Sequence, residues 1–247
     1  DEQQWCLRID QALEAHRFQL YHQPIARVDE IDGVRTHTEL LVRMLGEKGK
    51  IIPPMAFIPA AERYHRMAKI DEWVILHFLA ELSTRASHLD MLYNINLSGA
   101  SLSDEEFLTF LRAQLTQKSV DATKICFEIT ETAAISNLHR VTTFMKSLKQ
   151  LGCQFALDDF GSGMSSFRYL KQLPVDYIKI DGDFVQKLNE PVNQAIVQSI
   201  CSIGQAMDVQ IVAERVENLA TAAQLRALGV DYVQGYGIAR PSPFGSL

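Results

Sequence analysis

Long apolar runs, cysteine motifs and basic blocks are all missing from this sequence. None of the 247 residues lies in an apolar run that approaches the length of a membrane span, and no secretory signal opens the chain. The apolar fraction of 47% and the charged fraction of 22% are those of an ordinary globular protein. The composition therefore excludes a membrane-embedded domain, while it says little about a longer parent protein.

Cysteines are few and scattered. Cys6, Cys126, Cys153 and Cys201 lie far apart, with no Cys-x-x-Cys pair. We expect free thiols, packed as small core residues in a reducing compartment, in preference to a disulfide or a thiolate metal site. We therefore expect a cytoplasmic domain, although the parent protein could be anchored in a membrane.

Positive charge is also scarce. The net charge is −6 and no long run of Lys or Arg occurs, which argues against a DNA or RNA polymer as partner. A small phosphorylated ligand remains compatible, because a few placed cations or metal ions dominate the local field. No Walker-type phosphate loop and no Gly-x-Ser-x-Gly elbow occur, and the seven histidines lack metal-ligand spacing.

Strand-like and helix-like segments alternate along the chain. The expected strands are Arg17–Val28, Val34–Met44, Met91–Ser98, Lys124–Glu131, Cys153–Asp159, Val175–Asp181, Val209–Glu214 and Val230–Ile238. The expected helical segments are Pro54–Ala86, Ser103–Gln117 (opened by a Ser-x-x-Glu capping signal), Asn137–Leu151, Pro191–Met207 and Leu219–Leu228. Several strands are near-continuous apolar runs, as in a parallel sheet buried on both faces. Eight such units favour an α/β fold of the (β/α)8 barrel type over an open doubly wound sheet, and with no linker, residues 1–247 are expected to form a single domain.

Polar side chains stand within, at or just after the ends of these strands. They are Glu39, Asn96, Glu128, Glu131, Asp158, Asp159, Lys179, Asp181, Glu214, Glu217 and Gln234. Because a barrel brings the C-terminal ends of its strands to one rim, we expect these side chains to converge there. So many carboxylates cannot all ionise without cations, and ligands that are only oxygens favour Mg²⁺ or Mn²⁺ over zinc. Two such ions, bridged by Asp158 or Asp159, can activate a water and hold a phosphodiester.

Each residue also has an ordinary structural interpretation. A lone carboxylate at a strand end is often a helix N-cap or a solvated loop residue; Asn96 could form a turn, and Asp159 could cap the next helix. Lys179 could be a structural partner for an acid. The loop FGSGMSS could be a plain turn with Gly161 and Gly163 at positive φ, or a mobile segment that senses phosphate or metal. The functional hypothesis depends on the coincidence of such residues at six strand ends.

Nine short motifs, taken in order, are similar to those of a known family. They are QPI (Gln23–Ile25), ELLVR (Glu39–Arg43), FIPAAE (Phe57–Glu62), NINLS (Asn94–Ser98), FEITET (Phe127–Thr132), LDDFGSGMSS (157–166), IKID (Ile178–Asp181), VAERVEN (Val212–Asn218) and QGYGIARP (Gln234–Pro241). Over essentially its whole length the chain resembles the EAL domain, a bacterial phosphodiesterase of the second messenger cyclic di-GMP. The resemblance implies a modified TIM barrel with one antiparallel strand, and hydrolysis of cyclic di-GMP to linear pGpG.

The resemblance also implies roles at a centre for two Mg²⁺ or Mn²⁺ ions. The ligands of the first ion would be Glu39, Asn96, Glu128 and Asp158. The set around the second ion would be Asp158, Asp159 and Glu214. Lys179 resembles the lysine that contacts the attacking water or the phosphate, and Glu214 is also the candidate general base.

Further roles follow for substrate and support. Arg43 resembles the arginine that binds a substrate phosphate, for which a planar guanidinium is suited. Gln23 and Gln234 are expected to help hold the nucleotide. Glu131 resembles the residue that anchors the loop after Asp159, and our hypothesis is that ordering of this loop gates the second ion.

Two more acids, Asp181 and Glu217, are expected to support the site without touching the reacting atoms. As partners, the resemblance implies a homodimer and, in a longer parent protein, an upstream sensory or GGDEF-type domain. The chain begins with Asp1 and not with Met, which is why we expect it to be part of such a protein.

Met164 stands where an aromatic residue is common, and two further departures from the family pattern matter more. Leu40 stands where Ala is usual, but on a strand its side chain points away from Glu39. Arg215 stands where Gly is favoured, and it could swing to solvent or pair with Glu214 or Glu217 and perturb the second ion. The alternative function is therefore a catalytically weak or inactive EAL domain that acts as a cyclic di-GMP receptor. A metal-dependent barrel enzyme for another phosphodiester is a third hypothesis.

Overall fold

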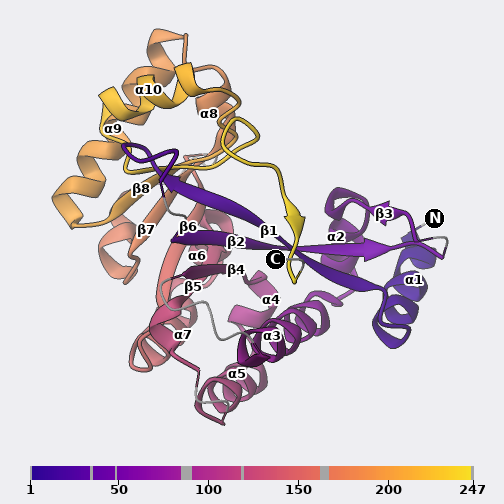
Figure 1. The fold of residues 1–247 in the computed structure, drawn as a ribbon. Coiled ribbons are helices and arrows are strands. Elements are labelled where there is room, and N and C mark those ends of the chain that lie inside the picture. Colours follow the sequence, from indigo (N-terminus) through magenta and orange to yellow (C-terminus); the bar gives the residue numbers. More distant parts are fainter. Residues whose placement is uncertain are drawn as a thin grey trace.

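Eight strands close into a barrel in the computed structural model, which describes residues 2–33, 36–47, 49–84, 91–117, 120–161 and 167–245. The barrel strands, in spatial order, are β1 (Phe18–Arg27), β2 (His37–Leu45), β4 (Leu92–Asn96), β5 (Ile125–Thr130), β6 (Gln154–Phe160), β7 (Tyr177–Ile180), β8 (Gln210–Ala213) and β9 (Tyr232–Val233), which pairs back with β1. This closed mixed barrel with surrounding helices confirms the predicted fold (Figure 1).

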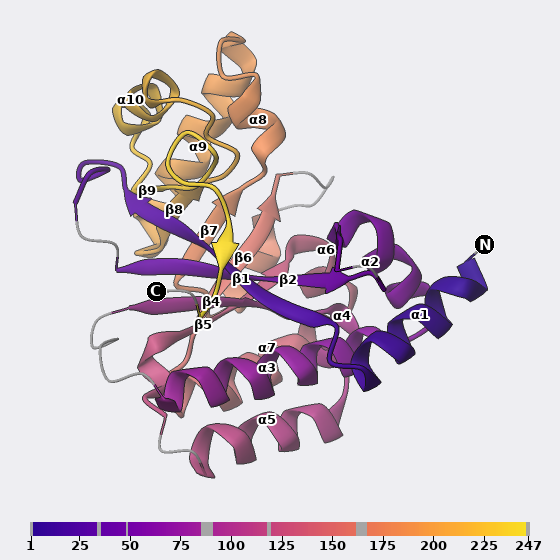
Figure 2. The same ribbon diagram turned by 45° about the vertical axis from the view of Figure 1, so that its right-hand side comes forward.

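One strand runs against the others. Strand β1 is antiparallel to both of its barrel neighbours, β2 and β9, whereas the ladders from β2 through β9 are parallel. The β1–β2 ladder continues beyond the barrel, and α1 (Glu2–Glu14) and α2 (Pro54–Arg63) pack at its far end (Figures 1 and 2). Short strand β3 (Ile51–Ile52) pairs antiparallel with β2, and β10 (Ser242–Pro243) pairs antiparallel with β1.

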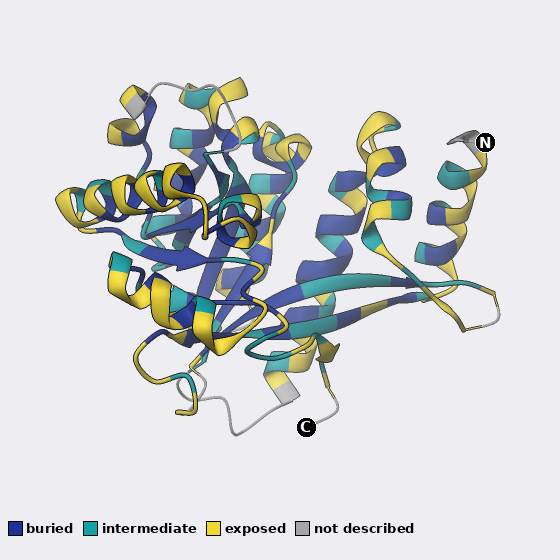
Figure 3. Cartoon of the chain, turned by 90° about the horizontal axis from the view of Figure 1, so that it is seen from above, coloured by how far each residue is buried: buried dark blue, intermediate teal, exposed yellow. Residues whose placement is uncertain are grey.

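The remaining helices surround the barrel. Besides α1 and α2 they are α3 (Met67–Thr84), α4 (Gly99–Leu102), α5 (Glu105–Gln117), α6 (Glu131–Ser136), α7 (Leu138–Lys149), α8 (Gly182–Gln186), α9 (Pro191–Met207) and α10 (Leu219–Leu228). In α7 the buried residues Val141, Phe144, Met145 and Leu148 recur at the spacing of one helical face. Figure 3 shows the buried strands at the centre and exposed residues on the outer helical faces.

Several element boundaries differ from expectation, and two of the differences have a visible cause. Helix α5 is capped by Asp104, whose Oδ1 accepts hydrogen bonds from the amides of Glu106 and Phe107, and not by the expected Ser103. The last strand ends at Val233, much earlier than expected, because Gly235 adopts φ +155° and packs directly against the backbone of Val216.

The described helices include none that is both long and apolar enough to cross a membrane. The main core lies between the strands and the helices and includes Leu40, so that side chain does point away from the barrel interior. A second, smaller apolar cluster consists of Ile25, Cys126, Ala156, Tyr177 and Val212, with Leu92 and Tyr232 packed against it. We call this cluster and its two flanking residues the barrel floor.

Candidate metal centre

The strand ends bring the predicted polar residues together at one rim of the barrel. Glu39 lies on β2, Asn96 ends β4, Glu128 lies on β5, Asp158 and Asp159 lie on β6, Lys179 lies on β7, and Glu214 and Gln234 directly follow β8 and β9. Within this group Glu39, Glu128, Lys179 and Gln234 are buried. Charged groups held this far from water need compensating partners, which the group supplies only in part.

Lys179 contacts four of the acids in this group. Its side chain is 1% exposed, and its Nζ lies 2.6 Å from Glu128 Oε2 and 2.8 Å from Glu214 Oε1. The same Nζ lies 3.4 Å from Asp158 Oδ1 and 3.5 Å from Glu39 Oε2. One ammonium therefore serves four carboxylates, so the described cluster carries an excess of negative charge.

The pKa values reflect this shortage of positive charge. Burial and the repulsion of Glu39 raise the pKa of Glu128 well above its ordinary value. Burial likewise raises the pKa of Glu214 to about 8. Burial alone would lower the pKa of Lys179, but the surrounding carboxylates raise it well above the usual range. The ammonium therefore stays charged, and the acids around it lack enough positive charge to balance them.

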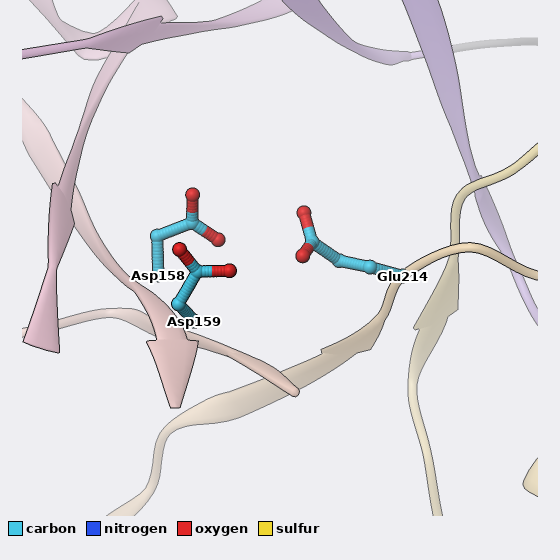
Figure 4. A group of neighbouring side chains, drawn as sticks. All are labelled: Asp158, Asp159 and Glu214. Carbon is cyan, nitrogen blue, oxygen red and sulfur yellow. The ribbon is translucent and has the colours of Figure 1, made fainter. Parts of the chain in front are cut away.

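A β-bulge explains how two adjacent aspartates serve one site. Between β6 and β7 the register moves from Leu157 opposite Ile178 to Phe160 opposite Ile180, which leaves one extra residue on β6. Asp159 adopts φ +52° there. On a regular strand two adjacent side chains would face opposite ways; here Asp158 and Asp159 each place a carboxylate oxygen within 4.8 Å of one of Glu214 (Figure 4).

This trio fits a divalent cation by two observations. Figure 4 shows the two aspartate carboxylates facing that of Glu214 across a small gap. Asp158 Oδ1 is buried and accepts no hydrogen bond from the described residues; the ammonium of Lys179 lies 3.4 Å away and is shared with three other acids. Burial and the neighbouring Asp158 raise the pKa of Asp159. Carboxylate oxygens arranged in this way are typical of a magnesium or manganese site.

Glu39 is held from three sides. Its Oε1 accepts a hydrogen bond of 2.7 Å from Asn96 Nδ2, which leaves Asn96 Oδ1 as the amide atom suited to a metal ion. Its Oε2 accepts one of 2.6 Å from Gln234 Nε2, which also donates to Gln23 Oε1 at 3.3 Å. Although burial opposes it, Lys179 and these amides keep the pKa of Glu39 below its ordinary value.

A cavity of about 430 Å³ opens beside the acidic group. It is lined by Gln23, Glu39, Gln186, Glu214, Arg215, Glu217, Gln234, Gly235 and Tyr236. Its volume lies within the range of small-ligand sites. Arg43 shares the face of β2 that carries Glu39, but does not line this cavity; its Nη1 donates to Val42 O at 2.9 Å, and its guanidinium lies 5.5 Å from the Tyr21 ring centroid.

The supporting acids occupy defined places. Buried Glu131 accepts hydrogen bonds from the Gly161 amide at 3.0 Å and from the Tyr169 hydroxyl. The rest of the expected gating loop, residues 162–166, lies outside the described residues. Asp181 caps α8 by accepting from the amide of Asp183 at 2.9 Å, and the exposed Glu217 accepts from Gln186 Nε2 at 3.1 Å.

Arg215 takes neither of the two acidic partners considered from the sequence. Its Nη1 pairs with Asp183 Oδ1 at 2.9 Å, and the side chain lies over Gly182 so closely that an added Cβ there would meet Arg215 Cδ at 2.3 Å. Arg215 adopts φ +51°, a conformation in which Gly is unstrained. The arginine is therefore accommodated by a neighbouring glycine.

Sequence reasoning missed three buried polar residues behind the rim. Asp71 on α3 accepts hydrogen bonds from the amide and hydroxyl of Ser98 and from the Ser101 hydroxyl, and so holds the chain just after Asn96. His37 and Asn94 lie in the barrel interior, two residues before Glu39 and Asn96 on the same faces of β2 and β4. The signal available was that spacing of two, which places residues on one face of a strand.

Known proteins share this sequence pattern. A family model described as "EAL domain" matches residues 7–241. The cyclic di-GMP phosphodiesterase PdeB of Shewanella oneidensis is 42% identical over 244 residues, which cover 98% of this chain and 28% of PdeB. The cyclic di-GMP phosphodiesterase PdeF of Escherichia coli is 37% identical over 242 residues, 96% of this chain and 31% of PdeF. The chain thus spans less than a third of the length of these two curated relatives.

Solved structures agree with the fold over nearly the whole chain. The PaMucR phosphodiesterase in its c-di-GMP complex superposes with a TM-score of 0.90 at 30% identity, covering 97% of this chain and 98% of that one. The FimX EAL domain from Pseudomonas aeruginosa, bound to c-di-GMP, gives 0.88 at 33% identity over 96% of each chain. Because the family model matches residues 7–241 of the 247, the chain belongs to the EAL domain family.

Proposed function

We propose that this domain hydrolyses one phosphodiester bond of cyclic di-GMP to give linear pGpG. The observation that carries the proposal is the rim cluster, in which Glu39, Glu128, Asp158 and Glu214 share the single ammonium of Lys179. Such a cluster has capacity for further cations. The family's relatives, named as phosphodiesterases of this nucleotide, supply the substrate class.

The residues fit two divalent cations, Mg²⁺ or Mn²⁺. One would be held by Glu39, Asn96, Glu128 and Asp158, and the other by Asp158, Asp159 and Glu214. When bound, the two ions would activate the attacking water and neutralise charge on the phosphodiester. Two atoms support this assignment. Asp158 Oδ1 accepts no hydrogen bond from the described residues, and the side-chain Oδ1 of Asn96 is left over when its Nδ2 donates to Glu39.

The chain's own groups supply the proton chemistry and the orientation. Water adds to phosphorus and gives up a proton, the P–O3′ bond breaks, and the leaving O3′ takes a proton from solvent, which leaves a 5′-phosphate on pGpG and a free 3′-hydroxyl. Glu214, which lines the cavity and lies 2.8 Å from Lys179 Nζ, is assigned as the base that takes a proton from that water. Lys179 holds Glu214 in place and presents its positive charge toward the reacting phosphate.

Substrate binding is assigned to residues along the rim. Gln23 and Gln234 line the cavity beside the acids, where their amides can meet the nucleotide. Arg43, further along the face of β2 that carries Glu39, offers a guanidinium to the second phosphate of the cyclic dinucleotide. The pairing of Arg215 with Asp183 favours an active hydrolase over a receptor, because the guanidinium is engaged outside the acidic trio.

We also propose a biological setting. The four cysteines are free thiols, as expected of a cytoplasmic domain. The domain is proposed to act as a homodimer within a longer signalling protein that carries an upstream sensory or GGDEF-type domain. Size-exclusion chromatography with light scattering tests the dimer.

One experiment tests the reaction. The domain is incubated with cyclic di-GMP and Mg²⁺ or Mn²⁺, and pGpG is followed by liquid chromatography. Asp158→Asn is expected to lower kcat by at least 100-fold, because it removes a charge that both ions need. Asp208→Asn, the same change at an exposed helix end away from the rim, is the matched control and should keep full activity. Binding without turnover would instead establish the receptor alternative.

A further inference from the structure

A buried chain of hydrogen bonds runs from the barrel floor to Glu128. His37 Nε2 bonds to Asn94 Oδ1, and Asn94 Nδ2 donates to Glu128 Oε1. His37 is 2% exposed, Asn94 0% and Glu128 1%. The chain joins three adjacent strands, β2, β4 and β5, inside the barrel and ends on the acid that also pairs with Lys179.

Chemistry sets the direction of each bond. The amide oxygen of Asn94 can only accept, so the imidazole must donate its Nε2–H. That bond fixes the orientation of the amide, and the NH₂ group of Asn94 then points at Glu128 Oε1. The other oxygen, Oε2, is left facing Lys179 and the centre of the rim cluster.

Packing does not account for these two polar residues. The ring of His37 lies against the rings of Tyr177 and Tyr232 of the barrel floor, with centroids 5.3 and 5.5 Å away. Burying an imidazole and an amide there costs free energy that apolar side chains of the same size would not. What the pair adds is a fixed position for one carboxylate.

We propose that His37 and Asn94 are positioning residues that hold the Glu128 carboxylate in the orientation required to ligate a divalent cation. The inference rests on the proposed function for the ligand role of Glu128. Groups that orient metal ligands in this way typically contribute a factor of roughly 10 to 100 to metal affinity.

The test measures Mn²⁺ binding by the metal-free domain, using electron paramagnetic resonance of free Mn²⁺, with no substrate present. His37→Phe keeps a ring of similar size but removes the donor, and should weaken binding roughly 10- to 100-fold. His37→Gln restores an N–H at about the same reach and should bind within roughly threefold of the parent. Cys126→Ala perturbs the same floor and should leave Mn²⁺ binding unchanged.

Asn94→Leu removes the hydrogen bond from Asn94 to Glu128. It provides the test if circular dichroism shows that His37→Phe does not fold. In a Glu128→Gln background the His37 substitution should have no further effect, because residues that act through one partner are not additive. Unaltered Mn²⁺ affinity in folded His37→Phe or Asn94→Leu overturns the inference, whether or not the parent cleaves cyclic di-GMP. His37-dependent binding without hydrolysis supports it and overturns the proposed reaction. A parent domain that binds no Mn²⁺ overturns both.

Discussion

Replacing Lys179 by Met should expose how much of this fold depends on one ammonium. The side chain is 1% exposed and lies within 2.6 to 3.5 Å of four carboxylate groups. Methionine fills much of the same volume but leaves those acids without their common partner. Removing one member of a buried ion pair typically costs about 3–5 kcal/mol. We expect a loss of that size in the metal-free domain at pH 8.

The loss should depend on pH in a defined direction. Glu128 and Glu214 already have raised pKa values in the folded protein, and without Lys179 these rise further. A raised carboxyl pKa means that the folded state binds more protons than the unfolded state, so its unfolding free energy falls as pH rises. Between pH 8 and pH 6 the Lys179→Met variant should therefore recover about 1.4 kcal/mol per pH unit for each acid that takes a proton.

Mn²⁺ should compensate the missing charge. A ligand at 100 times its Kd stabilises a protein by about 2.7 kcal/mol, and the variant should gain more than the parent because no ammonium competes for the acids. Activity should nevertheless be lost, since Lys179 is assigned a contact with the reacting groups.

Urea unfolding followed by far-UV circular dichroism, with EDTA or with Mn²⁺, measures these changes. Lys149→Met is the matched control, because Lys149 pairs with Asp176 at 2.6 Å while about a third exposed; such a pair contributes at most about 1 kcal/mol. If metal-free Lys179→Met at pH 8 were as stable as the parent, the electrostatic account of the rim cluster would be refuted.

Three further predictions concern residues around the centre. Burial raises the pKa of Asp71 to about 6, so between pH 4 and pH 7 the parent should lose about 2.4 kcal/mol of unfolding free energy that Asp71→Asn does not lose. Parallel urea titrations at both pH values check this, and an equal loss in the two proteins would contradict it. Gly182→Ala should destabilise the domain by about 1–3 kcal/mol because its Cβ would overlap Arg215. In an Arg215→Gly background the same change should be nearly neutral by thermal unfolding, and an undiminished loss would rule out that contact as the cause. Glu131→Ala removes the acceptor of the Gly161 amide and should lower kcat roughly tenfold or more, while the circular dichroism spectrum stays native. An unchanged rate would contradict the anchoring hypothesis.

Much of the architecture was accessible from pattern alone. Apolar strands that alternate with helices and end in polar residues predict a parallel barrel, and barrel topology then predicts that Glu39, Glu128, Asp158 and Glu214 meet. That one strand is reversed came from the family resemblance, because hydrophobic alternation is the same for a strand in either direction; that this strand is β1 came from the structure. Boundaries such as the early end of β9 depend on Gly235 packing against Val216, a contact between distant segments.

By itself, the sequence determined which residue types stand at the strand ends, and hence the chemistry of an oxygen-rich rim. Tertiary structure alone decided how they are used. The bulge that turns Asp158 and Asp159 toward one site exists only because the register between β6 and β7 shifts by one residue. Lys179 meets acids from four other strands or strand ends, and His37 reaches Glu128 through Asn94, only once the barrel closes. The physical reason is common to these cases: hydrogen bonds and ion pairs form between atoms a few ångströms apart, and residues as distant as 39 and 179 reach that separation only in the folded chain.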